Sequence, residues 1–451
     1  MACHCNEFSR AHMLRAAAAE AGRGLPRIEP GMPLPAGTGL SRRSFLMRAG
    51  VGMLSVYGAS RLGLRDLQQG IASAQGAQDP VLVTVFLDGG ADSLSILAPT
   101  QDSRYQALRP TLKLAPDAGT AFAEDTGLRW HPRAAALDQL HRAGKVTVLP
   151  AVGYDDADQS HFTSRHYWEV GELDPNSRTG WLGRMIDLIG TPDNPLQGLS
   201  LDGWLSPALA TSQMPVAAID GSSYDLWAPG VWGEVEDLMF AAVQETGRLS
   251  AGGGDAGRAL AGRIADQSIT LRSQLAPFGG DIEPPVAYPD DHFGQNMAAL
   301  AAMLAAGLPI RCVATSAPGG YDTHDNQDSS FADDIGLTFD TLAAFQADLE
   351  ARGLADRVLT LVWSEFGRRP EQNETGTDHG AAGAAFVIGT RVRGEMVGEF
   401  PGLAQLDPDD NLRSTSDFRH LYCSLLEQWF DVDAEPIIPG AGGFARPAIV
   451  A

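Results

Sequence analysis

The stretch Val81-Leu82-Val83-Thr84-Val85-Phe86-Leu87-Asp88-Gly89-Gly90-Ala91-Asp92 decides the fold. Its first seven residues form a short, nearly continuous apolar run, which is typical of a strand that is buried on both faces of a parallel sheet. Two glycines then permit a tight turn, and two aspartates place carboxylates directly after the strand. Ligands bind beyond the carboxyl ends of strands in such sheets, so this turn is the first candidate for a functional site.

Further apolar runs of the same kind alternate with segments of helical periodicity. The predicted strands are 81–87, 146–152, 310–314, 358–363 and 384–388, and the predicted helices are 132–142, 162–169, 296–306, 339–352 and 418–429. Strands alternating with helices predict an α/β protein, here a three-layer α/β/α sandwich with a mostly parallel central sheet. Residues of about 190–290 interrupt the rhythm with Gly-, Ser- and Pro-rich stretches and a predicted helix over 256–275. We expect this insertion to cover one sheet edge or to form a cap.

The N-terminal region differs from the rest of the chain in charge. Residues 1–74 contain nine arginines and four acidic residues, a local charge of +5, which leaves −28 for the remainder of a chain whose net charge is −23. Arg42 and Arg43 precede a short, moderately apolar stretch, and small residues follow at Ala72-Ser73-Ala74, which a signal peptidase accepts. We therefore expect residues 1–74 to be a twin-arginine signal region that is removed, and residues 75–451 to be a single domain.

The amino-acid composition restricts which partners the protein can bind and where in the cell it can act. Hydrophobic residues make up 44% and charged residues 20%, which is typical of a globular protein. No run of about 18 apolar residues is present, so we expect no permanent membrane span. The acidic surface repels nucleic acid and anionic lipid, so we expect no nucleic-acid partner. The leader predicts that the twin-arginine translocation machinery is a partner and that the protein is exported to the periplasm, the extracellular space or the cell surface.

Carboxylates and histidines follow the predicted strands and gather at one rim of the sheet. Asp322 and His324 are two residues apart, so both leave one face of an extended segment, and together they suit zinc or manganese. A solvated loop is the alternative for this pair. The candidate metal ligands are Asp92, Asp322, His324, Glu365, Asp378 and His379.

Three further residues at this rim are candidates for catalysis. Ser160 opens a predicted helix, where it is either an N-cap or a nucleophile, because a helix N-terminus stabilises an anionic ester. His161 is a candidate general base, metal ligand or packing residue. Arg368 is a candidate bidentate clamp for an oxygen of the substrate, with a structural ion pair to Glu365 as the alternative.

The motifs occur in one order, and together they suggest a family. They are Phe86-Leu87-Asp88-Gly89-Gly90-Ala91-Asp92, Ser160-His161-Phe162, Thr179-Gly180-Trp181-Leu182-Gly183, Gly320-Tyr321-Asp322-Thr323-His324, Ser364-Glu365-Phe366-Gly367-Arg368 and Gly376-Thr377-Asp378-His379-Gly380. With the twin-arginine leader, the chain resembles, over nearly its whole length, the exported family catalogued as domain of unknown function 1501. That family is grouped with the alkaline phosphatase and sulfatase superfamily.

The resemblance implies an alkaline phosphatase-like sandwich that holds divalent metal ions (Zn, Mn, Ca or Mg, usually two) and hydrolyses phosphate or sulfate esters. It implies that Asp92, Asp322, His324, Glu365, Asp378 and His379 bind metal, and that Ser160 stands where the superfamily has its nucleophile. The substrate expected from it is a small-molecule or glycan ester. Phe366 stands where the superfamily commonly has a histidine, so an exported, non-catalytic binding protein on the same scaffold is the alternative. A redox enzyme is a weaker one, because the chain has neither a cysteine cluster nor a dinucleotide-binding loop.

Overall fold

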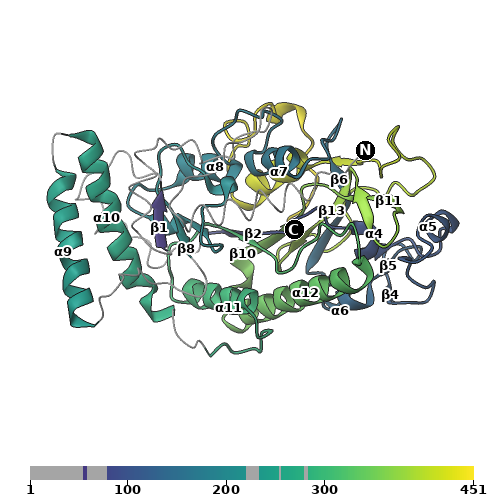
Figure 1. The fold of residues 1–451 in the computed structure, drawn as a ribbon, viewed down its shortest axis with the longest axis horizontal. Coiled ribbons are helices and arrows are strands. Elements are labelled where there is room, and N and C mark those ends of the chain that lie inside the picture. The colour runs from purple at the N-terminus through teal and green to yellow at the C-terminus, as the bar shows by residue number, and fades with distance from the viewer. Residues whose placement is uncertain (1–53, 58–78, 220–232, 253–254, 279–282) are drawn as a thin grey trace.

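The structure is a computed structural model that describes residues 54–57, 79–219, 233–252, 255–278 and 283–451. A nine-stranded sheet forms the centre of this part of the chain, in the order β1-β8-β7-β9-β2-β10-β13-β6-β14 (Figure 1). Its parallel strands are β2 (Val81–Phe86), β6 (Val146–Gly153), β7 (Gly198–Ser200), β8 (Val216–Ile219), β9 (Cys312–Ser316), β10 (Val358–Trp363) and β14 (Ser416–Asp417). The antiparallel strands are β1 (Leu54–Tyr57) and β13 (Gly383–Ile388). The expected α/β class with a mostly parallel sheet is confirmed.

Helices cover both faces of the sheet, which gives the three layers. On one face lie α6 (Ala135–Arg142), α11 (His292–Ala305) and α12 (Gln327–Ala351), and on the other lie α7 (His161–Val170), α8 (Trp181–Ile189) and α13 (Phe418–Ser424). Figure 1 shows α11 and α12 below the sheet and α7 and α8 above it. A π-helical turn, Leu425–Trp429, continues α13.

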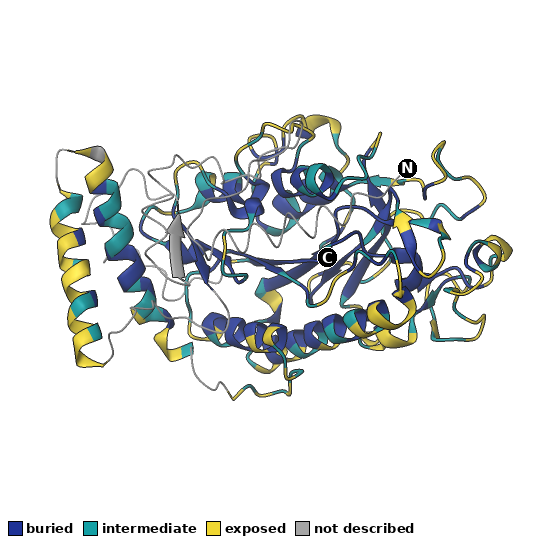
Figure 2. Ribbon diagram, viewed as in Figure 1, coloured by how far each residue is buried: buried dark blue, intermediate teal, exposed yellow. Residues whose placement is uncertain are grey.

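The central strand β2 explains why both faces are covered. Val81, Val83 and Val85 pack into the core on the α11–α12 side, whereas Leu82 and Phe86 pack into the core on the α7–α8 side. Burying an apolar side chain of this size contributes about 1.5–3 kcal/mol relative to leaving it exposed. Parallel neighbours on both sides, β9 and β10, satisfy the backbone of β2. Figure 2 shows the resulting buried centre and the exposed outer faces of the helices.

The prediction that 384–388 joins the sheet as a parallel strand is wrong. β13 runs antiparallel to both β10 and β6. The residues that lead into β13 therefore lie at the same rim as the residues that follow the parallel strands. This reversal has a physical cause, because the hairpin of β11 (Arg368–Gln372) and β12 (Thr377–His379) follows β10 and returns the chain at that edge.

The segment expected as an insertion contributes to the sheet as well as covering its edge. It supplies β7 and β8, and then the two long helices α9 (Glu234–Ala251) and α10 (Ala256–Leu275). These helices form a pair at one end of the described residues, where α10 packs against β1 (Figure 1).

The expected signal region lies mostly outside the described residues. Both Arg42-Arg43 and Ala72-Ser73-Ala74 do so, whereas Leu54–Tyr57 forms the edge strand β1. In the part of the chain that the structure describes, no helix combines the length and the apolar composition that crossing a bilayer requires.

Two small units complete the fold beside the rim. One is a sheet of β3 (Leu97–Ala98), β5 (Arg129–Trp130) and β4 (Thr120–Ala121), and the other contains the short helices α4 (Ser93–Ile96) and α5 (Ser103–Leu108). Both units follow β2 directly in the chain, so they bring polar residues next to the turn after that strand.

Candidate metal centre

Three histidines and one aspartate converge at the rim of the sheet. Nε2 of His324 lies 2.9 Å from Oδ1 of Asp322, and Nε2 of His379 lies 3.2 Å from the same oxygen. The other carboxylate oxygen of Asp322 lies 3.5 Å from Nε2 of His161. One ligand atom from each of His161, Asp322 and His379 lies within 4.8 Å of the others, a spacing that could hold a metal ion. Imidazole nitrogen and carboxylate oxygen together suit zinc or manganese.

Three separate segments bring these side chains together. His161 opens α7, which follows β6, and the loop after β9 carries Asp322 and His324. His379 ends β12, just before the antiparallel strand β13. Nε2 of His379 also lies 3.0 Å from Nε2 of His324, so two ring nitrogens face each other across the group.

The opposite nitrogen of each imidazole ring has an acceptor. Nδ1 of His161 lies 2.7 Å from Oε1 of Glu365, and Nδ1 of His379 lies 2.7 Å from the carbonyl oxygen of Gln159. Nδ1 of His324 lies 3.2 Å from Oδ1 of Asp378. An acceptor at Nδ1 fixes the orientation and the tautomer of a ring, so that its Nε2 is the atom presented to the group.

The electrostatics of the group centre on Asp322. Burial raises the pKa of this carboxyl group, but hydrogen bonding with the three histidine rings and the charge of Arg368 hold it far below its usual range. Burial lowers the pKa of His161, but hydrogen bonds with Asp322 and Glu365 outweigh burial and raise it to about 9. For His379 burial prevails, and its pKa is lowered. A proton on His161 is therefore favoured beside the aspartate, in addition to the charge of Arg368.

Glu365 is fully buried behind His161. Besides the histidine it accepts hydrogen bonds from the backbone N–H groups of Gly89 (3.1 Å) and Gly90 (3.0 Å) and from Oγ of Ser364 (3.0 Å). Burial raises its pKa, but the hydrogen bond and the charge of His161 lower it, so Glu365 remains a carboxylate. Glu365 thus contacts the Nδ1 side of the His161 ring, opposite the Nε2 atom that faces Asp322.

The turn after β2 requires its two glycines. Gly89 and Gly90 have φ values of +122° and +74°, which L side chains rarely adopt. A Cβ atom would lie 2.3 Å from the backbone nitrogen of Asp322 at the first position, and 2.2 Å from the ring of Phe366 at the second. Phe366, at the position where the resemblance leads one to expect a histidine, thus packs against this turn.

Arg368 does not have the open guanidinium that a substrate clamp requires. It is buried, and each of its guanidinium nitrogens already donates: to Gly90 O (2.7 Å), Thr377 O (2.7 Å), Gly89 O (2.5 Å), Tyr321 O (3.2 Å) and Asp322 Oδ1 (2.6 Å). The residue joins the β2 turn to the loop of Asp322 and to β12. The structure therefore assigns Arg368 to the framework of the group.

Asp92 lies outside the histidine group. It is fully buried, and its oxygens accept from both terminal nitrogens of Arg109, from Ser95 Oγ (2.6 Å) and from Gln327 Nε2 (2.5 Å). Burial raises the pKa of Asp92, but the charge and the hydrogen bonds of Arg109 outweigh burial, so the pKa lies below its ordinary value. Both oxygens that the sequence assigned to a metal are thus committed to a buried ion pair.

Ser160 and Asp378 flank the group. Ser160 is the N-cap of α7, and its Oγ accepts from the backbone N–H of Phe162 at 3.3 Å. Asp378 is largely exposed and also accepts from Nδ2 of Asn373 at 3.3 Å. Of the expected ligands, the structure thus brings together Asp322, His324 and His379, with Glu365 and Asp378 behind two of the rings. It adds His161, which the sequence placed among the catalytic candidates.

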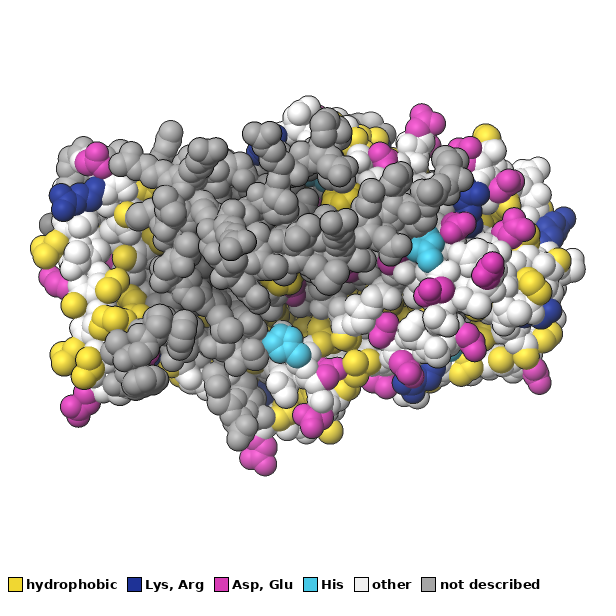
Figure 3. All heavy atoms as spheres, in the orientation of Figure 1, with side chains coloured by type: hydrophobic (Ala, Val, Ile, Leu, Met, Phe, Trp, Pro, Cys, Tyr) yellow, Lys and Arg dark blue, Asp and Glu magenta, His cyan; other side chains and the backbone are white. Residues whose placement is uncertain are grey.

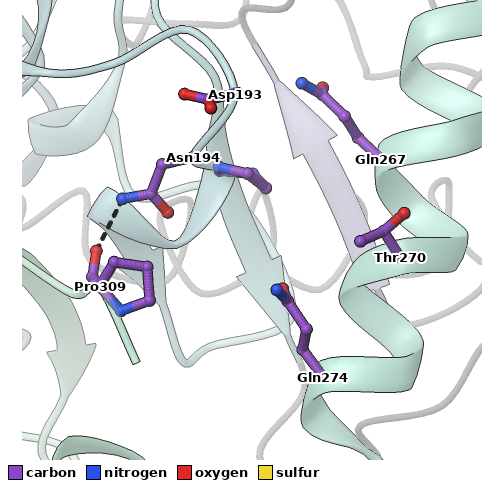
Figure 4. Close-up of a pocket in the computed structure, with 7 residues that line it drawn as sticks. Asp193, Asn194, Gln267, Thr270, Gln274 and Pro309 are labelled. Atoms are coloured by element: carbon purple, nitrogen blue, oxygen red, sulfur yellow. Dashed lines mark hydrogen bonds between the residues drawn. The ribbon is translucent and has the colours of Figure 1, made fainter. Parts of the chain in front are cut away.

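A separate pocket lies elsewhere in the described residues, between α10 and the turn that precedes β7 (Figure 4). Asn194 there donates to the carbonyl oxygen of Pro309 at 2.8 Å, while Gln267, Thr270 and Gln274 approach from α10. The pocket shares no residue with the histidine group. Figure 3 shows acidic side chains scattered over the described part of one face.

The family described as "Protein of unknown function (DUF1501)" matches residues 263–427. The matched segment contains Asp322, His324, Glu365, Asp378 and His379, and it begins after His161. No curated protein sequence matches the chain.

Among solved structures, the chain is similar to one described as a protein in the alkaline phosphatase superfamily from Vibrio parahaemolyticus. The two share 12% identity over 86% of this chain and 78% of that chain, with a TM-score of 0.34. It is also similar to the PsFucS1 sulfatase from Pseudoalteromonas sp., with 11% identity over 82% of this chain and 72% of that chain and a TM-score of 0.31. A third similar structure is Ps i-CgsB in complex with k-i-k-neocarrahexaose, with 9% identity over 82% and 75% of the two chains and a TM-score of 0.36.

Proposed function

We propose that the protein is a metal-dependent hydrolase of phosphate or sulfate esters, whose divalent ion is held by His161, Asp322, His324 and His379. One observation carries this proposal: three imidazole Nε2 atoms converge on one carboxylate, while an acceptor holds each Nδ1. Ion pairing alone does not require three rings turned the same way. Metal-binding histidines, in contrast, almost always donate their other ring N–H to a carboxylate, a carbonyl or water.

The residues fit a divalent cation chemically as well as geometrically. His161 already favours a proton beside Asp322, and a bound ion would supply positive charge there in place of that proton. Such an ion supplies Lewis-acid chemistry, because it polarises an ester oxygen and offsets the charge of an anionic substrate. Glu365 and the Gln159 carbonyl hold two of the rings in place for it.

The charge of the chain and the resemblance of its motifs support an anionic ester as the substrate class. Residues outside the expected leader carry a net charge of −28, so an anion needs a local cation to approach this surface. Arg368 is committed to backbone carbonyls and to Asp322, which leaves the ion as the cation that faces a substrate from this group.

Ser160 is the proposed nucleophile. It lies between Gln159, whose carbonyl contacts His379, and His161, whose ring faces Asp322, so its backbone runs along the group. At the N-terminus of α7 the helix dipole favours an anionic ester on its oxygen. In this step the Oγ–H bond and the ester P–O or S–O bond break, Oγ joins the transferring group, and the alcohol leaves with the proton. Water then attacks the phosphorus or sulfur atom, the bond to Oγ breaks, one proton of the water returns to Oγ, and free phosphate or sulfate leaves.

A non-catalytic binding protein on the same scaffold is the second candidate function. One observation favours it: both ring nitrogens of His161 face carboxylates, so this residue is not placed to serve as the general base for Ser160. We further propose that the protein is exported through the twin-arginine machinery to the periplasm, the extracellular space or the cell surface, as its leader predicts.

An activity panel separates the two functions. Phosphate monoesters, phosphate diesters and sulfate esters would be assayed with Zn, Mn, Ca or Mg, for the wild type and for His379→Ala. Turnover that requires both the ion and His379 supports the hydrolase. A protein that binds one ion per chain and turns over none of these esters is the binding protein instead.

A further inference from the structure

We propose that the buried network of Asp92, Arg109 and Gln327 positions the β11–β12 hairpin, and through Thr377 sets the geometry of the metal ligands; this inference rests on the metal centre proposed above. Asp92, Arg109 and Gln327 are buried, and none of them belongs to the histidine group. They come from three separate elements: the turn before α4, the end of α5 and the first turn of α12.

Arg109 forms hydrogen bonds with the backbone of β11, the first strand of the hairpin. While its terminal nitrogens pair with Asp92, Nε donates to the carbonyl oxygen of Pro370 at 2.9 Å and Nη2 donates to that of Arg369 at 3.0 Å. Both carbonyls belong to β11, directly after Arg368. The buried ion pair thus fixes the backbone from which Arg368 reaches Asp322.

Gln327 forms a hydrogen bond with Thr377, the first residue of β12, which is the second strand of the hairpin. Its Nε2 donates to Asp92 at 2.5 Å, and its Oε1 accepts from Oγ1 of Thr377 at 2.8 Å. Its backbone N–H donates to the carbonyl oxygen of Thr375 at 3.0 Å. The amide side chain therefore links the ion pair directly to β12.

Thr377 connects this buried network to the segments that carry the proposed metal ligands. It lies two residues before His379, and its backbone N–H donates at 3.1 Å to the carbonyl oxygen of Thr323, the residue between Asp322 and His324. Its own carbonyl accepts from Arg368. A shift of Thr377 would therefore move three of the four proposed ligands relative to His161.

The experiment titrates cobalt(II) into the purified full chain and follows the visible absorption, which reports the ligand geometry around the ion, together with the dissociation constant. Gln327→Ala is paired with Gln197→Ala. Gln197 is an equally buried glutamine whose amide accepts from Thr191 N (2.7 Å) and donates to Thr191 O (2.9 Å) and Pro215 O (3.0 Å), at the opposite ends of the strands. In a second pair, Thr377→Val removes the hydroxyl group at nearly constant volume, and Thr377→Ser keeps the hydroxyl group but removes a methyl group.

We expect Gln327→Ala and Thr377→Val to weaken cobalt binding about tenfold and to alter the absorption spectrum. This is the low end of the effect of direct partners of metal ligands, because these two residues act on the ligands through the backbone. Gln197→Ala should lose stability to urea with the wild-type affinity and spectrum, and Thr377→Ser should retain both. Wild-type affinity and spectrum in Thr377→Val would overturn the positioning role, and this variant decides the matter if Gln327→Ala does not fold. A wild type that binds no cobalt would overturn the metal centre itself, and the positioning role with it.

Discussion

Nδ1 of His161 lies 2.7 Å from Oε1 of Glu365, while Nε2 of the same ring faces Asp322. Two carboxylates therefore contact one imidazole from opposite sides. Glu365, which is buried, accepts hydrogen bonds from backbone N–H groups of the turn after β2. Asp322, which is more exposed, also contacts the other two histidines of the group. In a metal centre this arrangement makes Glu365 the orienting partner and Asp322 the ligand.

Glu365→Gln tests this division. The amide can still accept from the β2 turn, but it removes the charge that fixes His161, so metal affinity should fall about 10–100-fold. Isothermal titration with zinc measures the change. Glu169→Gln is the control, because Glu169 is a buried carboxylate on α7, the helix that His161 opens, and is paired with Arg165 at 2.8 Å. An affinity loss as large in the control as in Glu365→Gln would contradict the assignment.

Asp92→Asn should destabilise the fold by about 3–5 kcal/mol, because it leaves Arg109 buried without a charged partner. The pKa of Asp92 is lowered below its ordinary value of 3.8, so the stability from this pair is fully present above that value and is lost as pH falls through the folded-state pKa. The difference in urea unfolding between variant and wild type should thus stay constant from about pH 5 to pH 8. A cost below about 1 kcal/mol would argue against the buried pair.

Ser160→Ala separates an N-cap from a nucleophile. Loss of the cap alone costs about 1 kcal/mol of stability and leaves chemistry intact. As the proposed nucleophile, Ser160 should be required for ester turnover, so activity should fall at least about 100-fold while the ion content stays unchanged. Steady-state kinetics and elemental analysis on one preparation measure both quantities. Turnover within a few-fold of wild type would reduce Ser160 to a cap.

The leader is tested by Arg42→Lys together with Arg43→Lys. Because the twin-arginine route reads the arginine pair, the double variant should remain inside the cell, whereas the wild type is exported. Immunoblots of cell fractions, with a change of Arg23 and Arg27 to lysine as the control, measure the distribution. Export of the double variant through the same route would refute the leader.

The sequence predicted five of the nine strands in the described part of the central sheet, because short, continuous apolar runs are typical of buried strands. It missed β1, β7, β8 and β14. Strand β10, Val358–Trp363, begins and ends at the same residues as the predicted apolar run. The sequence also predicted that polar residues gather at one rim, since residues after parallel strands share one edge of a sheet. The direction of β13 was missed, because an apolar run of six residues does not encode which neighbour it joins.

Within the rim, the sequence could not predict which way each side chain turns. Asp92 follows the same strand as the Gly89-Gly90 turn, yet it pairs with Arg109, which belongs to none of the motifs in the sequence. His161 was seen beside Ser160, but its place opposite Asp322 depends on the start of α7 and on Glu365. His161 and Glu365 are 204 residues apart, and partners at such a separation leave no trace in local spacing.

The metal content of the purified wild-type protein tests the central claim most directly. Elemental analysis after exchange against zinc or manganese should find about one ion per chain in the wild type, and almost none in His161→Ala or His379→Ala. His420→Ala, a histidine of α13 outside the group, should keep the wild-type content. Wild-type protein without an ion, or equal content in all three variants, would contradict the account.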